Sequence, residues 1–599
     1  MLKNTMQIEN RSYKMLDFVK IPLSISPGMV ILQVLFDGII SSLVPTFQVL
    51  ATASFIDTAI RIFQGQAEKS QIVLPVLWVL LFVSYNYLMV LLGLVREKLN
   101  LNLTEAFRAA VTEKRARLEY RHVENNETWD LVERVGKEPV EQIGKGFRNL
   151  VITVGLVIRI GSVLMILLFR VWWAPFVIVA FSIPLLMLAA KTGKLSYEAA
   201  KEAAKHTRRA TYYQDVLTGR DYVEERALFG YSSELNERYK ARFLTAYGIN
   251  MKMQCSRYMK MSSSGMITVL VAVLVAGVLL APLGSGQISI GMFMGLVTAT
   301  LGLVPIIVFD LTNVTNDMAN GREYMRDLTA FGRLSETPGA TDLPSNLMVE
   351  PNCIELRDVS FAYPGTDVMI LKGLSLKLFS KRLYAFVGVN GAGKTTITKL
   401  LTGLYDNYAG EILIDGRNIR DFSQAELKSL FSIVYQDFAK YQVPMVDSIG
   451  LGDVRDMPME NIDGPLKVLG LDKAVSKMRS GIKTPLGRIN EDGIDLSGGQ
   501  WQKVAIARSL VSHAPIHILD EPTAALDPVA ESELYELFRK ASKDKSTILI
   551  THRLGATRIA DEVFVIADGR VAEQGTHKEL MDKGGIYAEM FEAQRGWYA

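Results

Sequence analysis

Long apolar runs recur through the first 310 residues of this 599-residue chain. A helix needs about 20 consecutive apolar residues to cross the roughly 30 Å hydrocarbon core of a bilayer, and uncharged runs of that length are rare in soluble domains. Two of the runs contain a charged residue, Asp37 in the first and Arg159 in the third. The pattern predicts six membrane-spanning helices, at residues 29–56, 72–95, 150–169, 171–190, 261–283 and 288–309.

Basic residues flank these runs unevenly. Lys and Arg are retained on the cytoplasmic side of a membrane, and they are abundant between the second and third runs and across residues 191–260. The connections on the other side carry only Arg61 and Lys69, then Arg170, then no basic residue at 284–287. We therefore expect a multi-pass protein of the cell membrane with both termini in the cytoplasm. The long basic connections are rich in Ala and Glu as well, which favours helices that continue into the cytosol.

The second half of the chain has a different pattern. A polar stretch with Pro, Gly, Ser and Thr at residues 334–351 separates the apolar runs from alternating strand and helix patterns. Such a composition is typical of a boundary between domains. The sequence predicts an all-α transmembrane domain at 1–333, a linker at 334–351, and an α/β nucleotide-binding domain at 352–599.

Composition argues against three classes of protein, namely a soluble enzyme, a nucleic-acid-binding protein and a disulfide-rich protein. Hydrophobic residues make up 49% of the chain, which is more than a soluble enzyme of this size needs. The net charge of +3 gives no indication of a nucleic-acid partner. The two cysteines, Cys255 and Cys353, lie far apart in the sequence, which excludes a disulfide framework.

A phosphate-binding loop lies between a predicted strand at 383–389 and a predicted helix at 395–404. The sequence there matches G-x-x-x-x-G-K-[ST], in which glycines let backbone N–H groups converge on phosphate oxygens at a helix N-terminus. Lys394 would neutralise phosphate charge, and Thr395 could ligate Mg²⁺. The motif predicts an ATP-binding site that includes Gly388, Asn390, Gly391, Gly393, Lys394, Thr395 and Thr396.

Two adjacent carboxylates follow a second apolar strand, at residues 516–519. Asp520 is expected to hold Mg²⁺ through water, and Glu521 to orient and polarise the water that attacks the terminal phosphate. Between these carboxylates and the phosphate loop lies the Gly-rich turn LSGGQ at 496–500, which opens a predicted helix at 501–510.

Together, the phosphate loop, the Asp520–Glu521 pair and the LSGGQ turn resemble the motifs of ATP-binding-cassette (ABC) proteins. The resemblance extends from residue 353 to the C-terminus, and the six-helix pattern upstream is similar to the exporter branch of that family. It implies a half-transporter, a transport ATPase in which a transmembrane domain is fused to the nucleotide-binding domain.

The resemblance also implies roles for residues that their own sequence context would leave unassigned. Tyr363 corresponds to the aromatic residue that stacks on adenine, and Gln436 to the glutamine that contacts Mg²⁺. His552 corresponds to the catalytic histidine at the terminal phosphate, and Asp527 to the loop that couples two ATP sites. The signature residues that would contact ATP are Ser497, Gly498, Gly499 and Gln500.

In this family each ATP is held between the phosphate loop of one chain and the signature turn of the other, so the resemblance implies a dimer. Because one chain carries intact catalytic and signature residues, a homodimer is favoured and a heterodimer stays open. Segments near 126–135 and 216–225 resemble the short coupling helices that connect the two domains of such transporters.

The cargo is not defined by these motifs. Exporter-type relatives carry drugs, lipids or peptides, some proteins of the same fold import iron chelates, and an ATP-gated channel or sensor subunit is a more distant alternative. Arg159 lies about 15 Å deep in its predicted helix at 1.5 Å per residue. A charge at that depth either contacts cargo or pairs with an acid such as Asp37.

Overall fold

The chain folds as two compact units. The first comprises Met1–Glu113 and Leu131–Leu334, and the second comprises Lys114–Asp130 and Ser335–Ala599. A short segment of the N-terminal half, Lys114–Asp130, therefore belongs to the C-terminal unit. The computed structural model describes residues 6–170, 172–173, 175–176, 199, 202–346, 350–456, 462–489, 491–522, 531, 535–536 and 545–595.

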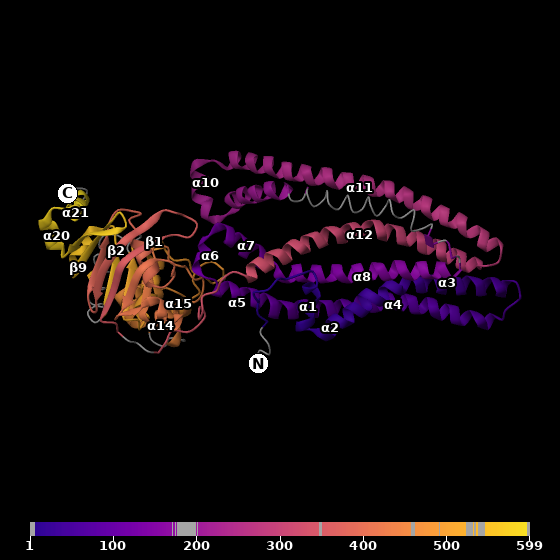
Figure 1. Cartoon of the computed structure of the whole chain (residues 1–599), viewed down its shortest axis with the longest axis horizontal. Coiled ribbons are helices and arrows are strands. Elements are labelled where there is room, and N and C mark those ends of the chain that lie inside the picture. The colour runs from indigo at the N-terminus through magenta and orange to yellow at the C-terminus, as the bar shows by residue number, and fades with distance from the viewer. Residues whose placement is uncertain are drawn as a thin grey trace. The chain divides into compact units, whose positions relative to one another are not determined.

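The first unit is helical (Figure 1). Its long helices lie side by side, with α12 packed on α3, α8 and α11, and with α3 also packed on α4. Residues 202–218 are helical as well. The helices are α1 (Asp17–Ile25), α2 (Pro27–Gln33), the π-helix η1 (Val34–Ile40), α3 (Ser41–Phe63), η2 (Lys69–Ile72), α4 (Val73–Leu103), η3 (Thr104–Arg108), α5 (Ala109–Arg117), α7 (Asn126–Gly136), α8 (Pro139–Arg170), η4 (Arg220–Tyr222), α10 (Val223–Phe229), α11 (Ser232–Gly284) and α12 (Ile290–Gly332).

Three helical stretches among the described residues are long and apolar enough to cross a membrane: Pro27–Phe63, Lys69–Arg117 and Pro139–Phe169. They contain the predicted runs at 29–56, 72–95 and 150–169. The runs at 261–283 and 288–309 fall in α11 and α12, where shorter apolar parts are described at Val273–Gly284 and Ile290–Ala299. Nearly all of the predicted run at 171–190 lies outside the described residues.

Apolar side chains of α4 face outward. Leu80, Leu91 and Leu94 are 55%, 61% and 70% exposed. An exposed apolar surface of this kind is costly in water and is expected where lipid or another protein covers it.

Glycines allow the helices of the first unit to approach closely. A Cβ at Gly155 in α8 would lie 2.6 Å from the hydroxyl oxygen of Ser42 in α3. A Cβ at Gly291 in α12 would overlap the backbone carbonyl oxygen of Ala53 in α3, and the Gly291 N–H donates to Asp57 Oδ1 at 2.8 Å. Helices in lipid gain little from hydrophobic burial against one another, so close packing at small residues contributes much of their association.

The second unit contains two sheets. One is antiparallel with the order β2-β1-β4-β5, and the other has the order β10-β9-β3-β8-β7-β6. In the second sheet β9, β3, β8, β7 and β6 are parallel neighbours, and only the β10–β9 pairing is antiparallel. Strands β3, β7 and β8 are buried along their whole length, as expected for parallel strands covered on both faces.

The strands are β1 (Cys353–Ala362), β2 (Met369–Phe379), β3 (Leu383–Val387), β4 (Ala409–Ile414), β5 (Arg417–Asn418), β6 (Phe431–Val434), β7 (Ile516–Asp520), β8 (Ser546–Ile550), β9 (Glu562–Ala567) and β10 (Arg570–Gly575). The helices are α6 (Tyr120–Glu124), α13 (Lys394–Leu401), η5 (Ile419–Asp421), α14 (Gln424–Leu430), α15 (Met445–Gly450), η6 (Val454–Asp456), α16 (Asp463–Val468), α17 (Asp472–Val475), η7 (Gly481–Lys483), α18 (Gly498–Val511), η9 (Leu554–Ile559), α20 (His577–Lys583) and α21 (Ile586–Arg595).

One core of the second unit joins both sheets to α13. It includes Phe361 of β1, Phe386 of β3, Ile397 of α13 and Ile518 of β7, each at most 1% exposed. A second core packs α18 on α15 and α16 and includes Trp501. The first core fixes α13, and with it the phosphate-binding loop, against the central strands.

We expect Gly291→Ala to destabilise the first unit. The added methyl group would overlap backbone atoms of α3 that cannot rotate away, and overpacking of this kind costs about 1–3 kcal/mol. Thermal unfolding of the purified protein in detergent measures the effect. Gly277→Ala in α11 is the matched control, because a Cβ there would meet no described atom within 4 Å. Equal unfolding temperatures for the two variants would contradict the prediction.

Candidate functional site

The phosphate-binding loop connects β3 to α13, and its glycines are required by their surroundings. A Cβ at Gly388 would overlap the carbonyl oxygen of Ile566 in β9. Gly391 and Gly393 have φ angles of 83° and 102°, which other residues rarely adopt. Asn390 and Gly391 are exposed. The loop therefore runs tightly along the sheet and presents its outer part to solvent.

Lys394 lies inside this loop. It is 6% exposed, and its Nζ donates to the carbonyl oxygens of Gly388 and Val389 at 2.8 and 3.1 Å. Burial lowers the pKa of Lys394, and the carboxylates of Glu521 and Asp520 oppose that shift. The ammonium group is thus held where an anion at the loop would meet it. The first turn of α13 places Thr395 and Thr396 directly after it, and no side chain among the described residues caps this helix N-terminus.

Asp520 ends β7 at the same edge of the sheet. Its side chain is buried, with 1% of the residue exposed, and neither carboxylate oxygen accepts a hydrogen bond from the described residues. Burial raises the pKa of Asp520 to about 6, Glu521 adds to the shift, and Thr395 and Lys394 oppose it. A buried carboxylate without a hydrogen-bond donor is suited to a cation.

Glu521 and His552 meet because β7 and β8 are parallel neighbours, with Asp520 paired to Ile550. His552 Nδ1 lies 3.3 Å from Glu521 Oε1. Glu521 has a φ of 49°, in the left-handed region, and its N–H donates to the carbonyl oxygen of Ile550 at 3.0 Å. A left-handed non-glycine residue costs about 1–3 kcal/mol and is frequent at functional sites.

Gln436 and Tyr363 reach the site from other strands. Gln436 is exposed and follows β6, which pairs with β7 through Val434 and Leu519. Tyr363 follows β1, and its hydroxyl group lies 3.0 Å from Thr396 Oγ1. The structure therefore places both residues next to elements that carry the phosphate loop or the carboxylates.

The signature turn lies on an exposed surface. Ser497 caps α18 in a capping box with Gln500, in which the hydroxyl oxygen accepts from the Gln500 N–H at 3.3 Å and Gln500 Oε1 accepts from the Ser497 N–H at 3.0 Å. Ser497 and Gly498 are exposed, and Gly499 and Gln500 are partly so. No hydrogen bond or ion pair among the described residues joins this turn to the phosphate loop of the same chain. Asp527 lies outside the described residues.

Arg159 lies in α8 and is partly buried. Its Nε is enclosed and has no hydrogen-bond partner among the described residues. Asp37, the suggested partner, pairs instead with Arg96 of α4, whose Nη2 lies 3.1 Å from Asp37 Oδ2, and Asp37 and Arg159 form no ion pair. The charge of Asp37 is thus compensated from a different helix.

Two residues at the site were missed in the sequence, Lys399 and Glu124. Lys399 Nζ lies 5.2 Å from the centroid of the Tyr363 ring and 2.7 Å from Glu124 Oε1. The only local signal was that Lys399 follows Thr396 by three residues on one helix face. The contact with Glu124, 275 residues away, has no local signal.

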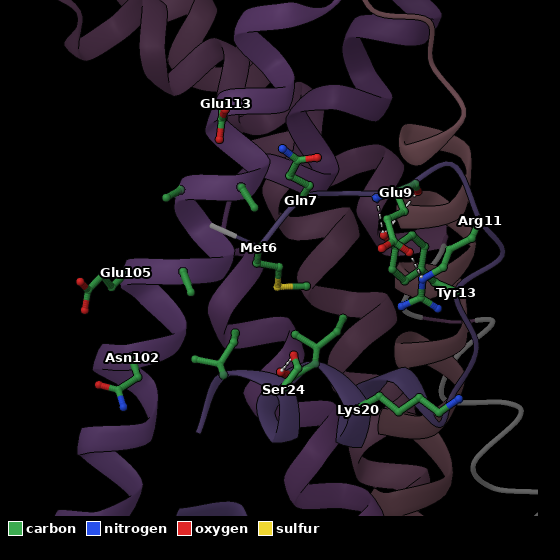
Figure 2. A pocket seen from close by; sticks show the side chains of 15 residues that line it. Met6, Gln7, Glu9, Arg11, Tyr13, Lys20, Ser24, Asn102, Glu105 and Glu113 are labelled. Atoms are coloured by element: carbon green, nitrogen blue, oxygen red, sulfur yellow. Dashed lines mark hydrogen bonds and ion pairs between the residues drawn. The ribbon is translucent and has the colours of Figure 1, made fainter. Parts of the chain in front are cut away.

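A separate cavity of about 930 Å³ lies in the first unit, beside the N-terminal segment. Figure 2 shows Asn102 and Glu105 on one side of it, and Glu9, Arg11 and Tyr13 on the other. Arg11 Nε lies 3.1 Å from Glu9 Oε2, so its charge is compensated locally. None of the residues singled out in the sequence lines this cavity.

The second unit is thus a nucleotide-binding domain of the P-loop class, and the first unit is a helical region with membrane-length apolar helices. A family model described as ABC transporter matches residues 371–524. The chain is 30% identical to the subtilin transport ATP-binding protein SpaT of Bacillus subtilis over 505 residues, which cover 83% of this chain and 81% of that protein. The chain belongs to the ABC transporter family.

Other comparisons agree with this assignment. The chain is 36% identical to the ATP-dependent lipid A-core flippase of Escherichia coli (strain K12) over 243 residues, which cover 41% of each protein. The structure of a bacterial Atm1-family ABC exporter with ATP bound superimposes with a TM-score of 0.75 at 24% identity, covering 95% of this chain and 99% of that one. The fold is therefore that of an ABC exporter, and the protein is a membrane-associated transport ATPase that binds ATP.

We expect Asp520→Asn to stabilise the protein when nucleotide and metal are absent. The raised pKa means that the folded state binds this proton more tightly than the unfolded state does. The resulting stability is fully present below about pH 4 and is lost as the pH rises towards about 6. Near pH 7.5 the neutral variant should gain up to about 3 kcal/mol.

Thermal unfolding in EDTA near pH 5 and near pH 7.5 tests this expectation. The advantage of Asp520→Asn should be larger near pH 7.5. An advantage that is absent, or equal at both pH values, would contradict a strained, unpaired carboxylate at this position.

Proposed function

We propose that the chain is one half of a dimeric exporter that uses ATP hydrolysis to move an amphipathic or hydrophobic cargo by alternating access. The observation that carries the proposal is the division of the ATP site. One sheet edge brings together the phosphate loop, Asp520, Glu521 and His552. The signature turn is exposed and forms no hydrogen bond or ion pair with them among the described residues. Relatives named for subtilin transport and for lipid A-core flipping support a peptide or a lipid as cargo and favour export over iron-chelate import.

In this proposal the transmembrane domain occupies residues 1–333, the linker 334–351, and the nucleotide-binding domain 352–599. Both termini and the nucleotide-binding domain lie in the cytoplasm of a multi-pass protein of the cell membrane. The unequal distribution of Lys and Arg between the two sides supports this orientation.

The residues of the sheet edge have distinct proposed roles. Backbone N–H groups from Gly388 to Thr396, together with Lys394, bind the phosphates at the N-terminus of α13. Tyr363 stacks on the adenine base. Glu521 accepts the proton of the attacking water, and His552, at 3.3 Å, orients the Glu521 carboxylate and the terminal phosphate.

Mg²⁺ is the metal that the donor set fits. Asp520 offers a buried carboxylate without a hydrogen bond from the described residues, and Thr395 and Gln436 offer further oxygen ligands. When bound, the ion would neutralise charge on the β- and γ-phosphates. The pKa of Asp520, near 6, leaves the carboxylate ionised at neutral pH and available to the ion.

The proposed dimer is a homodimer. The signature residues Ser497 to Gln500 of one copy would complete the phosphate site of the other, and two copies would form two equal sites. A heterodimer with another half-transporter is the alternative. No residue of the catalytic set or the signature is replaced in this chain, which favours two equal sites.

Expressed alone and purified in lipid, the chain should form a dimer with cooperative, Mg²⁺-dependent ATPase activity. In the same preparation, Glu521→Gln should retain ATP binding and lose nearly all turnover, because the phosphate contacts remain while water activation is removed. Mass measurement, ATP binding and phosphate release check these results. A monomer that hydrolyses ATP only after another half-transporter is added would overturn the homodimer, and near wild-type turnover of Glu521→Gln would overturn its role.

Arg159 is the proposed cargo contact. Its enclosed Nε without a partner among the described residues, inside a membrane-length helix, suits an anionic or peptidic group. Transport into inside-out vesicles over a panel of peptides, lipids and iron chelates identifies the cargo. With that cargo, Arg159→Ala should lower cargo-stimulated ATPase activity and leave basal activity intact. Loss of yield with unchanged stimulation per folded dimer would instead indicate a structural role.

A further inference from the structure

Helix α6, which belongs to the second unit, bonds to two side chains of that unit through the carboxylate of Glu124. Glu124 Oε1 lies 2.7 Å from Lys399 Nζ in α13, and the other carboxylate oxygen of Glu124 accepts a hydrogen bond from the hydroxyl group of Tyr405. The Lys399 side chain is 15% exposed and that of Glu124 is 38% exposed. This ion pair is more enclosed than an ordinary surface pair, which limits its screening by salt.

Lys399 lies between two tyrosine rings. Its Nζ is 5.3 Å from the ring centroid of Tyr120 in α6 and 5.2 Å from that of Tyr363. Burial alone would lower the pKa of Lys399, but the hydrogen bond that its ammonium group donates to Glu124 and the two nearby tyrosines raise the pKa above its ordinary value. The side chain is therefore a cation at neutral pH, and each cation–π contact contributes about 0.5–2 kcal/mol.

The ring of Tyr363 is held from several directions. Tyr405 and Phe361 lie at centroid distances of 5.7 and 5.1 Å, both in edge-to-face geometry, and the hydroxyl group meets Thr396. A cavity of about 260 Å³ adjoins this ring, and residues of both segments line it: Arg121, Glu124, Asn125, Tyr363, Pro364 and Tyr405. Two of the side chains that hold the ring, Lys399 and Tyr405, are themselves bonded to Glu124 of α6.

We propose that Lys399 and Glu124 are positioning residues that set the ring of Tyr363 for the nucleotide base. Glu124 fixes the ammonium group of Lys399, and the ammonium group fixes the ring. The contribution of the base to nucleotide affinity therefore depends on a segment that lies more than 200 residues before the nucleotide-binding domain in the sequence. This inference rests on the proposed role of Tyr363 as the base contact.

The test compares a ligand that has a base with one that lacks it. In full-length protein carrying Glu521→Gln, which blocks turnover, binding of ATP and of inorganic tripolyphosphate is measured by calorimetry. Lys399→Met keeps the aliphatic stem and removes the charge. It should weaken ATP binding about threefold to tenfold, as expected for the loss of one partly buried cation–π contact, and leave tripolyphosphate binding unchanged.

Three further variants sharpen the comparison. Glu124→Gln should act in the same direction, and Lys399→Arg should restore most of the ATP affinity because it keeps a cation. Lys377→Met is the matched control, since Lys377 of β2 also forms an ion pair, with Glu355 on β1, but its side chain is 57% exposed and has no cation–π contact with Tyr363. It should change neither affinity.

The outcomes separate this inference from the proposed base contact. Tyr363→Ala should reduce ATP binding and spare tripolyphosphate binding. If it does so while Lys399→Met and Glu124→Gln leave ATP binding unchanged, the positioning role is overturned and the base contact stands. If Tyr363→Ala has no effect on ATP binding, the base contact itself fails. If Lys399→Met weakens the binding of ATP and of tripolyphosphate equally, the substitution acts on the phosphate loop, and the positioning role of Lys399 is overturned.

Discussion

The buried carboxylate of Asp520 is the constraint on which the nucleotide-binding unit depends. An ionised carboxylate without a hydrogen-bond donor is unfavourable in a protein interior, and its pKa near 6 expresses that cost. The structure holds it there because β7 is buried between β6 and β8 and ends at this residue. The same parallel register brings Glu521 and His552 together at the end of the neighbouring strands. A ligand that supplies a cation removes the cost, so binding and stability are linked at this edge of the sheet.

The signature turn has a different physical character. Its capping box already satisfies the backbone N–H of Ser497 and of Gln500 within the turn. The Ser497 hydroxyl group accepts in that box, so its own hydrogen stays available to a phosphate oxygen. The turn is therefore ordered before any ligand arrives, and it needs no rearrangement to contribute to a site formed with the proposed second copy. A preorganised donor of this kind costs little ordering entropy on binding.

Local signals made most of the site predictable from the sequence. The phosphate loop stands between β3 and α13 as expected, although β3 ends at Val387 and α13 ends at Leu401, before the predicted limits of 389 and 404. The strand ends early because the loop begins at Gly388, which is packed on β9. The helix ends early because Gly403 adopts a left-handed φ of 70°. The apolar runs likewise predicted long helices because their length alone carries the signal.

Contacts between distant segments could not be predicted in this way. Asp37 was a reasonable partner for Arg159, but it pairs with Arg96, which the packing of α4 on α3 brings to it. The coupling segment was expected at 126–135, whereas the side chains that contact α13 lie just before it, in α6. The periodicity of a helical sequence shows which face of the helix is apolar, but it does not show which element packs against that face.

Helix α6 is connected to the ring of Tyr363 through Lys399, so the docking of α6 and the geometry of the ring are thermodynamically linked. If the docked α6 favours the ring geometry that binds the base, then base binding must favour docked α6 by the same factor. The segment Lys114–Asp130 is continuous with α5 on one side and α7 on the other, and both helices extend into the sequence of the first unit. The end of α5 and the start of α7 therefore flank α6 in the sequence. Glu124 is suited to this position because a single carboxylate joins Lys399 and Tyr405, so the loss of α6 would remove a partner from two side chains that contact Tyr363.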